Sequence, residues 1–184
     1  CPNRVQMLSE GKHFEDFYRK QKSEGRRLEL YSCSGPMHLL DPYSYVRLQA
    51  WTAWDMGAEA TSFWAFGDTG GGNPWNPYAA PGVNYAPMFL ASDSVTPGKH
   101  MEALRESVED FEYFVMFKDA IAKTKPNNPV LPKAKELLKT GARRVLDTEN
   151  ANKLNWSDDK NRWIAEEVRL EILETLVALQ YSTQ

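Results

Sequence analysis

The hydrophobic and polar positions in the first third of the chain follow two spacings, and each spacing predicts a different element. Apolar residues three and four apart predict one helix over residues 9–24, with Ser9 as its N-cap. A β-compatible run at 28–33 predicts a strand, a helix follows over 41–56, and an aromatic-rich run at 60–66 predicts a second strand. Helix, strand, helix, strand with short connections is typical of a parallel sheet built from βαβ units.

The middle of the chain loses this pattern. From Asp68 to Pro97 the sequence is rich in glycine and proline and predicts a long irregular loop. Loops of this length inside a compact domain are uncommon, and function is the usual reason for keeping one. Helical spacing then returns and predicts a long helix to about Lys123, another around 134–145 and a last one from about Ser157. The last third of the chain is therefore expected to be all helical.

Composition limits the fold and the partners. The 184 residues are too few for a complete (β/α)₈ barrel, which takes about 250 residues. Hydrophobic residues make up 42% and charged residues 26%, as in a globular chain with a core of its own. The net charge of −3 comes without runs of one sign, which argues against nucleic acid as a partner. No stretch has the length and apolarity of a membrane span, so no membrane partner is expected.

Several common kinds of catalytic or cofactor site find no support in the sequence. His13, His38 and His100 lie far apart without ligand-like neighbours, and this argues against a metal site. Cys1 and Cys33 fit neither a metal spacing nor a disulfide framework. The three consecutive glycines of the long loop lack the lysine and the spacing of a phosphate-binding loop. We therefore expect no metal ion and no cofactor.

Aromatic residues gather where the predicted strands end, and they are the strongest functional signal in the chain. Tyr31 lies in the first predicted strand and Trp64 near the end of the second, while the long loop carries Asp68, Trp75 and Tyr85. Loops that follow parallel strands line the binding face of α/β folds, and flat rings beside hydrogen-bond acceptors suit a sugar. These five residues form the predicted substrate-binding set, for a carbohydrate. The alternative for Tyr31 and Trp64 is that they fill the core. Further candidate acceptors are Asp41, Asn73 and Asn76.

Four segments resemble a known family: Tyr31–Pro36, Tyr45–Trp51, Phe63–Phe66 and Arg105–Tyr113. They are similar to the C-terminal part of the catalytic domain of glycoside hydrolase family 123, and even more to its relative, domain of unknown function 4091. In the last segment, Ser107 and Phe111 replace the glycine and tyrosine of the family pattern. The resemblance spans about residues 1–123. It implies a TIM-like (β/α)₈ barrel, of which this chain holds the helix after strand six and strands seven and eight with their helices.

The resemblance also implies an activity on amino sugars. Members of such a family cleave 2-acetamido sugars by substrate-assisted catalysis, with an adjacent Asp–Glu pair expected on an earlier strand, upstream of Cys1. The start of the chain, without an initiator methionine, is expected to be the middle of a longer protein. Residues 1–124 are then the C-terminal part of a glycosidase-like barrel and 125–184 a helical hairpin extension, and the missing N-terminal half of the barrel is a partner. Trp64 and Tyr31 carry over as a pocket wall.

Two other functions stay open at this point. The chain could belong to a non-catalytic carbohydrate-binding or structural barrel, or residues 99–184 could form a self-contained helical interaction module. An Asp–Glu pair in the upstream sequence, at the end of a mid-barrel strand, would favour the enzyme. The Arg105–Tyr113 segment is expected to be structural, because it lies within a long amphipathic helix. We expect Arg105 to pair with Glu102, Glu109 or a loop carbonyl.

Overall fold

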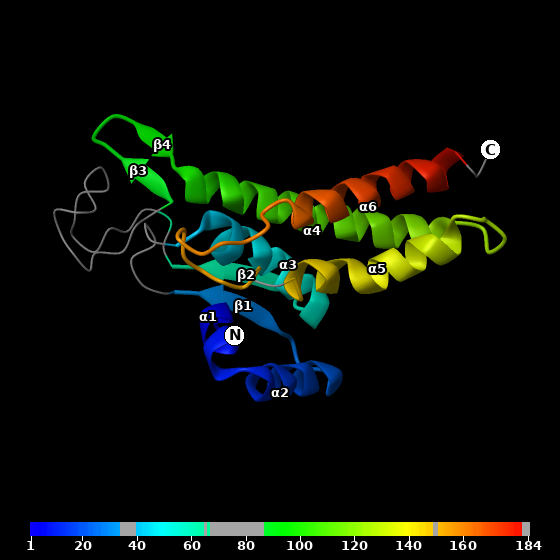
Figure 1. Cartoon of the computed structure of the whole chain (residues 1–184), viewed down its shortest axis with the longest axis horizontal. Helices are drawn as coiled ribbons and strands as arrows, with labels where there is room; N and C mark the ends of the chain where they lie inside the picture. Colours follow the sequence, from blue (N-terminus) through cyan, green and yellow to red (C-terminus); the bar gives the residue numbers. More distant parts are fainter. Residues whose placement is uncertain (34–39, 65, 67–86, 149–150, 182–184) are drawn as a thin grey trace.

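The protein is a mixed α/β chain, as its sequence predicts. The computed structural model describes residues 1–33, 40–64, 66, 87–148 and 151–181 (Figure 1). Its elements, in chain order, are α1 (Arg4–Glu10), α2 (Lys12–Ser23), β1 (Glu29–Ser32), the π-helical turn η2 (Tyr43–Arg47), α3 (Leu48–Met56), β2 (Ala60–Phe63), β3 (Met88–Leu90), β4 (Val95–Pro97), α4 (Lys99–Lys123), α5 (Leu131–Leu146) and α6 (Ile164–Tyr181).

Strands β1 and β2 form the predicted parallel pair. Tyr31 lies opposite Ser62 in the register, and the Trp64 amide extends the ladder by donating to the carbonyl of Ser32 at 2.9 Å. On the other edge of β1, Asn3 bridges to Tyr31 in parallel, and the Tyr31 amide donates to the carbonyl of Pro2 at 3.0 Å. Three parallel segments therefore lie side by side. The second strand ends at Phe63, earlier than the predicted 60–66.

The predicted helix over 9–24 corresponds to α2, which begins at Lys12, and the structure adds a separate helix, α1, before it. Gly11 separates α1 from α2 with φ of 80°, a left-handed conformation that ends one helix before the next begins. Ser9 lies inside α1, where its hydroxyl donates to the carbonyl of Gln6, so it does not cap a helix. The cap of α1 is Asn3, whose side chain accepts from the amide of Val5. The apolar positions that predicted the helix, Phe14, Phe17 and Tyr18, all lie in α2, so the pattern located α2 and missed α1.

The connection between the two strands passes through η2 and α3. Asp41 lies just before η2, and its carboxylate accepts a hydrogen bond from the amide of Tyr43 at 3.1 Å. Gly57 ends α3 in a left-handed conformation, with φ of 67°. The helix is buried on most of its circumference because it lies between β1–β2 and the long helices, and Leu48 and Trp51 are almost completely inaccessible.

Helices α4, α5 and α6 run along the long axis of the molecule (Figure 1). With α3 they enclose the largest hydrophobic cluster, in which the ring of Trp51 lies edge-on to Phe114 at 5.1 Å and Trp54 stacks on Phe114 at 4.9 Å. The predicted boundary between 124 and 125 falls just after α4. Helices on both sides of it contribute to this one cluster.

The structure differs from two of the sequence predictions for the residues after 87. Residues 88–97, predicted as part of the irregular loop, pair as the antiparallel strands β3 and β4, because two β-prone runs flank a polar turn. The last helix begins at Ile164 rather than near Ser157. Residues before it form a loop anchored by Lys160, whose ammonium donates to the Ser44 hydroxyl at 2.8 Å and lies 3.2 Å from the Asp41 carboxylate.

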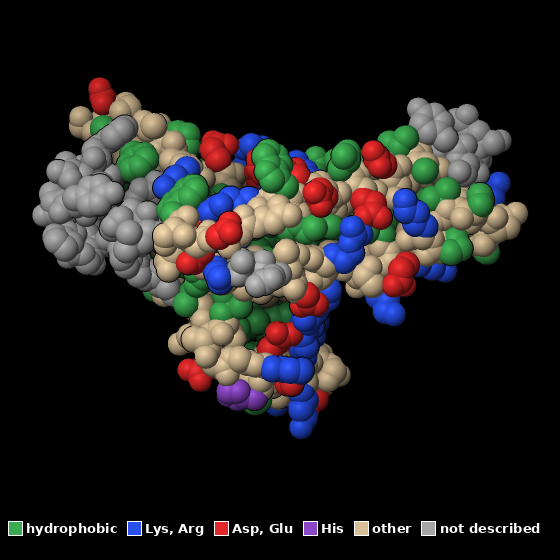
Figure 2. All heavy atoms as spheres, in the orientation of Figure 1, with side chains coloured by type: hydrophobic (Ala, Val, Ile, Leu, Met, Phe, Trp, Pro, Cys, Tyr) green, Lys and Arg blue, Asp and Glu red, His purple; other side chains and the backbone are tan. Residues whose placement is uncertain are grey.

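Within the described part of the chain, the strands form two separate two-stranded sheets, β1–β2 and β3–β4. The described residues contain no closed barrel. No described helix combines the length and apolarity needed to cross a membrane. Basic and acidic side chains are interspersed over the face shown in Figure 2, including the area where α2 lies near α5.

Candidate functional site

The two aromatic residues predicted at the ends of the strands lie on one face of the parallel pair. Side chains alternate between the faces of a strand, and residues opposite each other in the register share a face. Tyr31 is opposite Ser62, so the next residues on that face are Cys33 and Trp64. We call the surface formed by Tyr31, Cys33, Ser62 and Trp64 the Tyr31–Trp64 face. The sequence identified two of its four members, and the register supplies the others.

The other face of the pair is covered by the connecting helix. Leu30 and Ser32 point to it and are almost fully buried. The Ser32 hydroxyl donates to the Gln49 side-chain carbonyl at 2.9 Å, and the Gln49 amide donates to the backbone carbonyl of Ser62 at 3.1 Å. These two bonds fix α3 against both strands, and they leave the Tyr31–Trp64 face on the side away from α3.

The side chains of the Tyr31–Trp64 face are more exposed than those of the hydrophobic core. Trp64 is 51% exposed, and Tyr31 is half-buried. Neither ring belongs to the three hydrophobic clusters that the described residues form. Among the described residues, both rings thus lie outside the hydrophobic core. An exposed indole and a phenol on one face can together offer a flat apolar surface and a hydroxyl hydrogen bond.

Tyr31 and Cys33 interact on this face. A hydrogen bond between the Tyr31 hydroxyl and the Cys33 thiol raises the pKa of Tyr31 above its ordinary value of 10.0. Like any tyrosine at neutral pH, the phenol is protonated and can donate a hydrogen bond. Both cysteines of the chain are exposed and unbridged.

The remaining predicted site residues divide into two groups. Asp68, Trp75 and Tyr85 lie outside the described residues. Asp41, a further candidate acceptor, is buried and structural: it caps the start of η2, and its carboxylate lies 3.2 Å from the ammonium of Lys160 and 2.8 Å from Arg162. Such a saturated carboxylate has no access to a ligand, so the prediction that Asp41 accepts from a sugar is wrong.

The Arg105–Tyr113 segment lies in α4, and Arg105 pairs with Glu102 at 3.1 Å and Glu109 at 2.5 Å, as predicted. The more important residue of the segment is Asp110, which is 2% exposed. Its carboxylate receives Arg47 Nε at 2.7 Å, Arg47 Nη2 at 3.2 Å and Trp51 Nε1 at 2.8 Å. Two of the segments that carry the family resemblance are therefore joined by a buried ion pair, which positions η2 and α3 against α4.

Comparison of the chain with known protein families and with curated proteins finds no significant match. Among the described residues, no three His, Cys, Asp or Glu side chains gather closely enough to hold a metal ion. The function proposed below rests on the residues of the chain and on the geometry of the parallel pair.

Proposed function

We propose that this chain is the C-terminal part of a carbohydrate-active (β/α)₈ barrel, a glycoside hydrolase that acts on 2-acetamido sugars by substrate-assisted catalysis. In this proposal the catalytic carboxylates lie upstream, and the chain contributes part of the wall that binds the sugar. The observation that carries it is the position of Tyr31 and Trp64, which share one accessible face of a parallel pair close to the carboxyl ends of its strands. Barrel enzymes place their sites at that end.

The arrangement around the parallel pair supports the barrel. In such a barrel each strand has one face toward the interior and one toward the surrounding helices. Leu30 and Ser32 face the helix that connects the strands, and Tyr31 and Trp64 face the side that the interior would occupy. Asn3, paired in parallel with Tyr31, takes the place of the preceding strand.

The chemistry of the proposed wall fits an amino sugar. The apolar C–H face of a pyranose stacks on the indole of Trp64, and the Tyr31 hydroxyl donates to a sugar oxygen. Asp68, four residues beyond Trp64, supplies a charged acceptor for a sugar hydroxyl. Stacking on one large ring contributes on the order of 1–3 kcal/mol of binding free energy, and a charged hydrogen bond about 1.5–3 kcal/mol.

The test is a calorimetric titration of the longer protein with N-acetylglucosamine, N-acetylgalactosamine and their oligomers. We expect Trp64→Ala and Asp68→Ala to weaken binding by the amounts above while circular dichroism stays unchanged. Phe17→Ala serves as the matched control, because Phe17 is an aromatic residue of similar exposure, 55%, on α2. Unchanged affinity in both variants would mean that Trp64 belongs to the barrel core and that Asp68 serves another purpose.

A further inference from the structure

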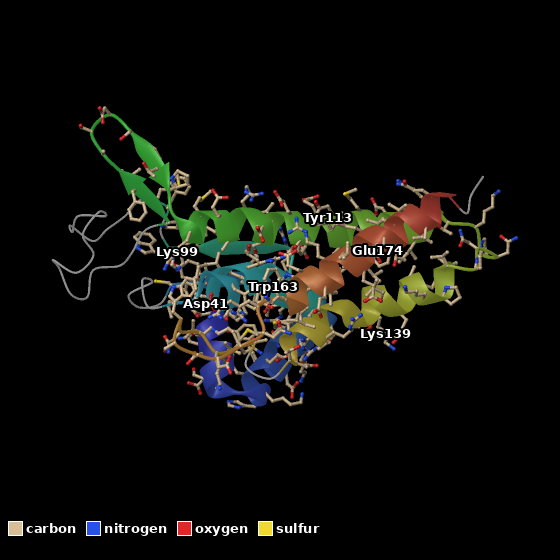
Figure 3. All side chains as sticks on the ribbon, turned by 45° about the horizontal axis from the view of Figure 1, so that its top comes forward. Asp41, Lys99, Tyr113, Lys139, Trp163 and Glu174 are labelled. Atoms are coloured by element: carbon tan, nitrogen blue, oxygen red, sulfur yellow. The ribbon has the colours of Figure 1, made fainter. Side chains whose placement is uncertain are left out.

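A cavity lies between η2, the first turns of α4 and the start of α6, and it has a volume of about 310 Å³. Apart from Tyr43 and Ala103, its lining consists of Trp163, Arg47, Arg162, Glu102, Glu106 and Glu166. None of these residues belongs to the Tyr31–Trp64 face. Figure 3 labels Trp163 at the beginning of α6.

Trp163 is the distinctive member of this lining. It is 72% exposed, the highest value among the described large hydrophobic side chains. Its backbone is fixed, because its amide donates to the Asn161 side chain at 2.9 Å and its carbonyl accepts from the amide of Glu167 at 3.0 Å. A large apolar ring held at the edge of a polar cavity is a platform for stacking.

The polar groups of the cavity are held by ion pairs. Arg47 contacts Glu106 at 3.0 Å and Glu166 at 2.5 Å. The two other charged residues of the lining also have partners. Glu102 pairs with Arg105 at 3.1 Å, and Arg162 pairs with Asp41 at 2.8 Å. Each carboxylate of the lining thus has a guanidinium partner, and both kinds of group line the cavity as acceptors and donors.

These ion pairs limit the class of ligand that the cavity can bind. A cation would compete with the guanidinium groups that already contact each carboxylate, and an anion would meet three glutamates. A neutral polyhydroxylated molecule uses both kinds of group, because each hydroxyl donates and accepts. The volume is at the lower end of small-molecule pockets, which span about 300–1,000 Å³, and this favours one ring over an oligomer.

We propose that this cavity binds a single pyranose ring, which stacks on Trp163 and hydrogen-bonds to Glu102, Glu166 and Arg162. It is a second carbohydrate site, separate from the Tyr31–Trp64 face. The inference goes beyond the proposed function and does not depend on it, because it needs neither the barrel nor upstream catalytic residues.

The test is a titration of the ¹⁵N-labelled chain with N-acetylglucosamine and with galactose, followed by the indole N–H resonances of its tryptophans. We expect the Trp163 resonance to shift and saturate with at least one of the two sugars. Trp163→Ala should weaken that binding about tenfold or more, and Trp163→Phe should retain part of it. Leu170→Ala is the control, because Leu170 is 57% exposed on the same helix.

Other outcomes would overturn the inference. The absence of a saturable Trp163 shift with both sugars would do so, as would equal affinity of the wild type and Trp163→Ala. Tighter binding of tetramethylammonium chloride than of either sugar would show a cation site instead. Trp64→Ala separates the two proposals: it should leave the Trp163 shift intact. If it abolished all sugar binding, the Tyr31–Trp64 face would be the sugar site and the cavity at Trp163 would not.

Discussion

Arg47 and Asp110 are the pair of residues on which the packing of η2 against α4 depends most. Both are buried, and the Asp110 carboxylate meets two nitrogens of Arg47 as well as the indole N–H of Trp51. The ion pair outweighs burial and raises the pKa of Arg47 above its ordinary value. The buried charge of Arg47 needs its partner.

Replacement of Asp110 by alanine should destabilise the chain by about 3 kcal/mol, the lower end of the range for a broken buried ion pair. The lower end applies because Glu106 and Glu166 still contact Arg47. Urea unfolding followed by circular dichroism measures the change. The control is Glu109→Ala, which removes a partly exposed carboxylate and should cost about 1 kcal/mol or less. Equal effects of the two variants would contradict this account.

Gly57 is a second residue whose identity the backbone requires. Its φ of 67° costs little for glycine, and a side chain in this region is strained by about 1–2 kcal/mol. The nearest atom to an added Cβ is Lys22 Cε at 3.6 Å, so there is space for the methyl group. Gly57→Ala should therefore lower the free energy of unfolding by about that amount. Gly57→Asn should lower it less, and a neutral Gly57→Ala would be inconsistent with the left-handed conformation.

At the scale of elements, a cluster of charges joins α2, α3 and α5. Arg143 of α5 pairs with Glu15 at 2.9 Å and with Asp55 at 2.7 Å, and Arg19 contacts the same two carboxylates. Burial acts to raise the pKa of Glu15, but the hydrogen bonds from Arg19 and Arg143 outweigh it, so the pKa of Glu15 lies below its ordinary value of 4.5.

The lowered pKa of Glu15 makes its contribution to stability depend on pH. Because the folded-state pKa of Glu15 is lower than the unfolded one, the stabilising contribution is complete above about pH 4.5 and is lost as the pH falls through the folded-state pKa. Glu15→Gln should therefore lower the unfolding temperature at neutral pH and have little effect in acid. If the difference in unfolding temperature between wild type and variant increased on acidification, it would contradict the lowered pKa of Glu15. Scanning calorimetry across pH 3 to 7 (about the range of carboxylate titration) measures it.

The sequence predicts elements better than the contacts between them. β-prone runs located β1 and β2, apolar spacing located α4, and Gly57 marked the end of α3, because these signals are local. The bond between Arg47 and Asp110 could not be read from the sequence, since it depends on how η2 packs against α4, 63 residues away. The start of α6 was misplaced for a similar reason: Lys160, which holds the preceding loop, has its partners near residues 41–44. Of the predicted site, the sequence placed Tyr31 and Trp64 near the ends of the two strands, and the register of the strands, which needs the structure, shows that the two residues share a face.

At the scale of the whole molecule, the edge and the open face of the parallel pair are the surfaces most suited to association. The residues Ala60, Thr61 and Ser62 of β2 are exposed, and Trp64 and Phe66, which follow them, are each more than half exposed. Unpaired strand edges beside apolar side chains favour contact between chains. We expect sedimentation velocity at micromolar concentration to show self-association of the chain. A monomer with a sharp, cooperative unfolding transition would contradict this expectation.

The helices alone are not expected to form a stable module. Residues 99–184 lack Leu48 and Trp51 of α3, which fill the centre of the largest hydrophobic cluster between α4 and the two last helices. Loss of such side chains leaves a cavity at Phe114 and costs several kcal/mol. The segment expressed alone should therefore show helical circular dichroism without a cooperative thermal transition. A folded, cooperatively melting segment would instead favour an independent helical module.

The central claim is that this chain completes a barrel that cleaves amino sugars, and hydrolysis of 4-nitrophenyl 2-acetamido-2-deoxyglycosides tests it most directly. The assay compares this chain with the protein expressed from the full reading frame. The account predicts release of 4-nitrophenol by the longer protein, loss of that activity when the upstream Asp–Glu pair is changed to Asn–Gln, and no activity of this chain alone. A full reading frame without further strand and helix units upstream, or a longer protein that hydrolyses none of these glycosides, would contradict it.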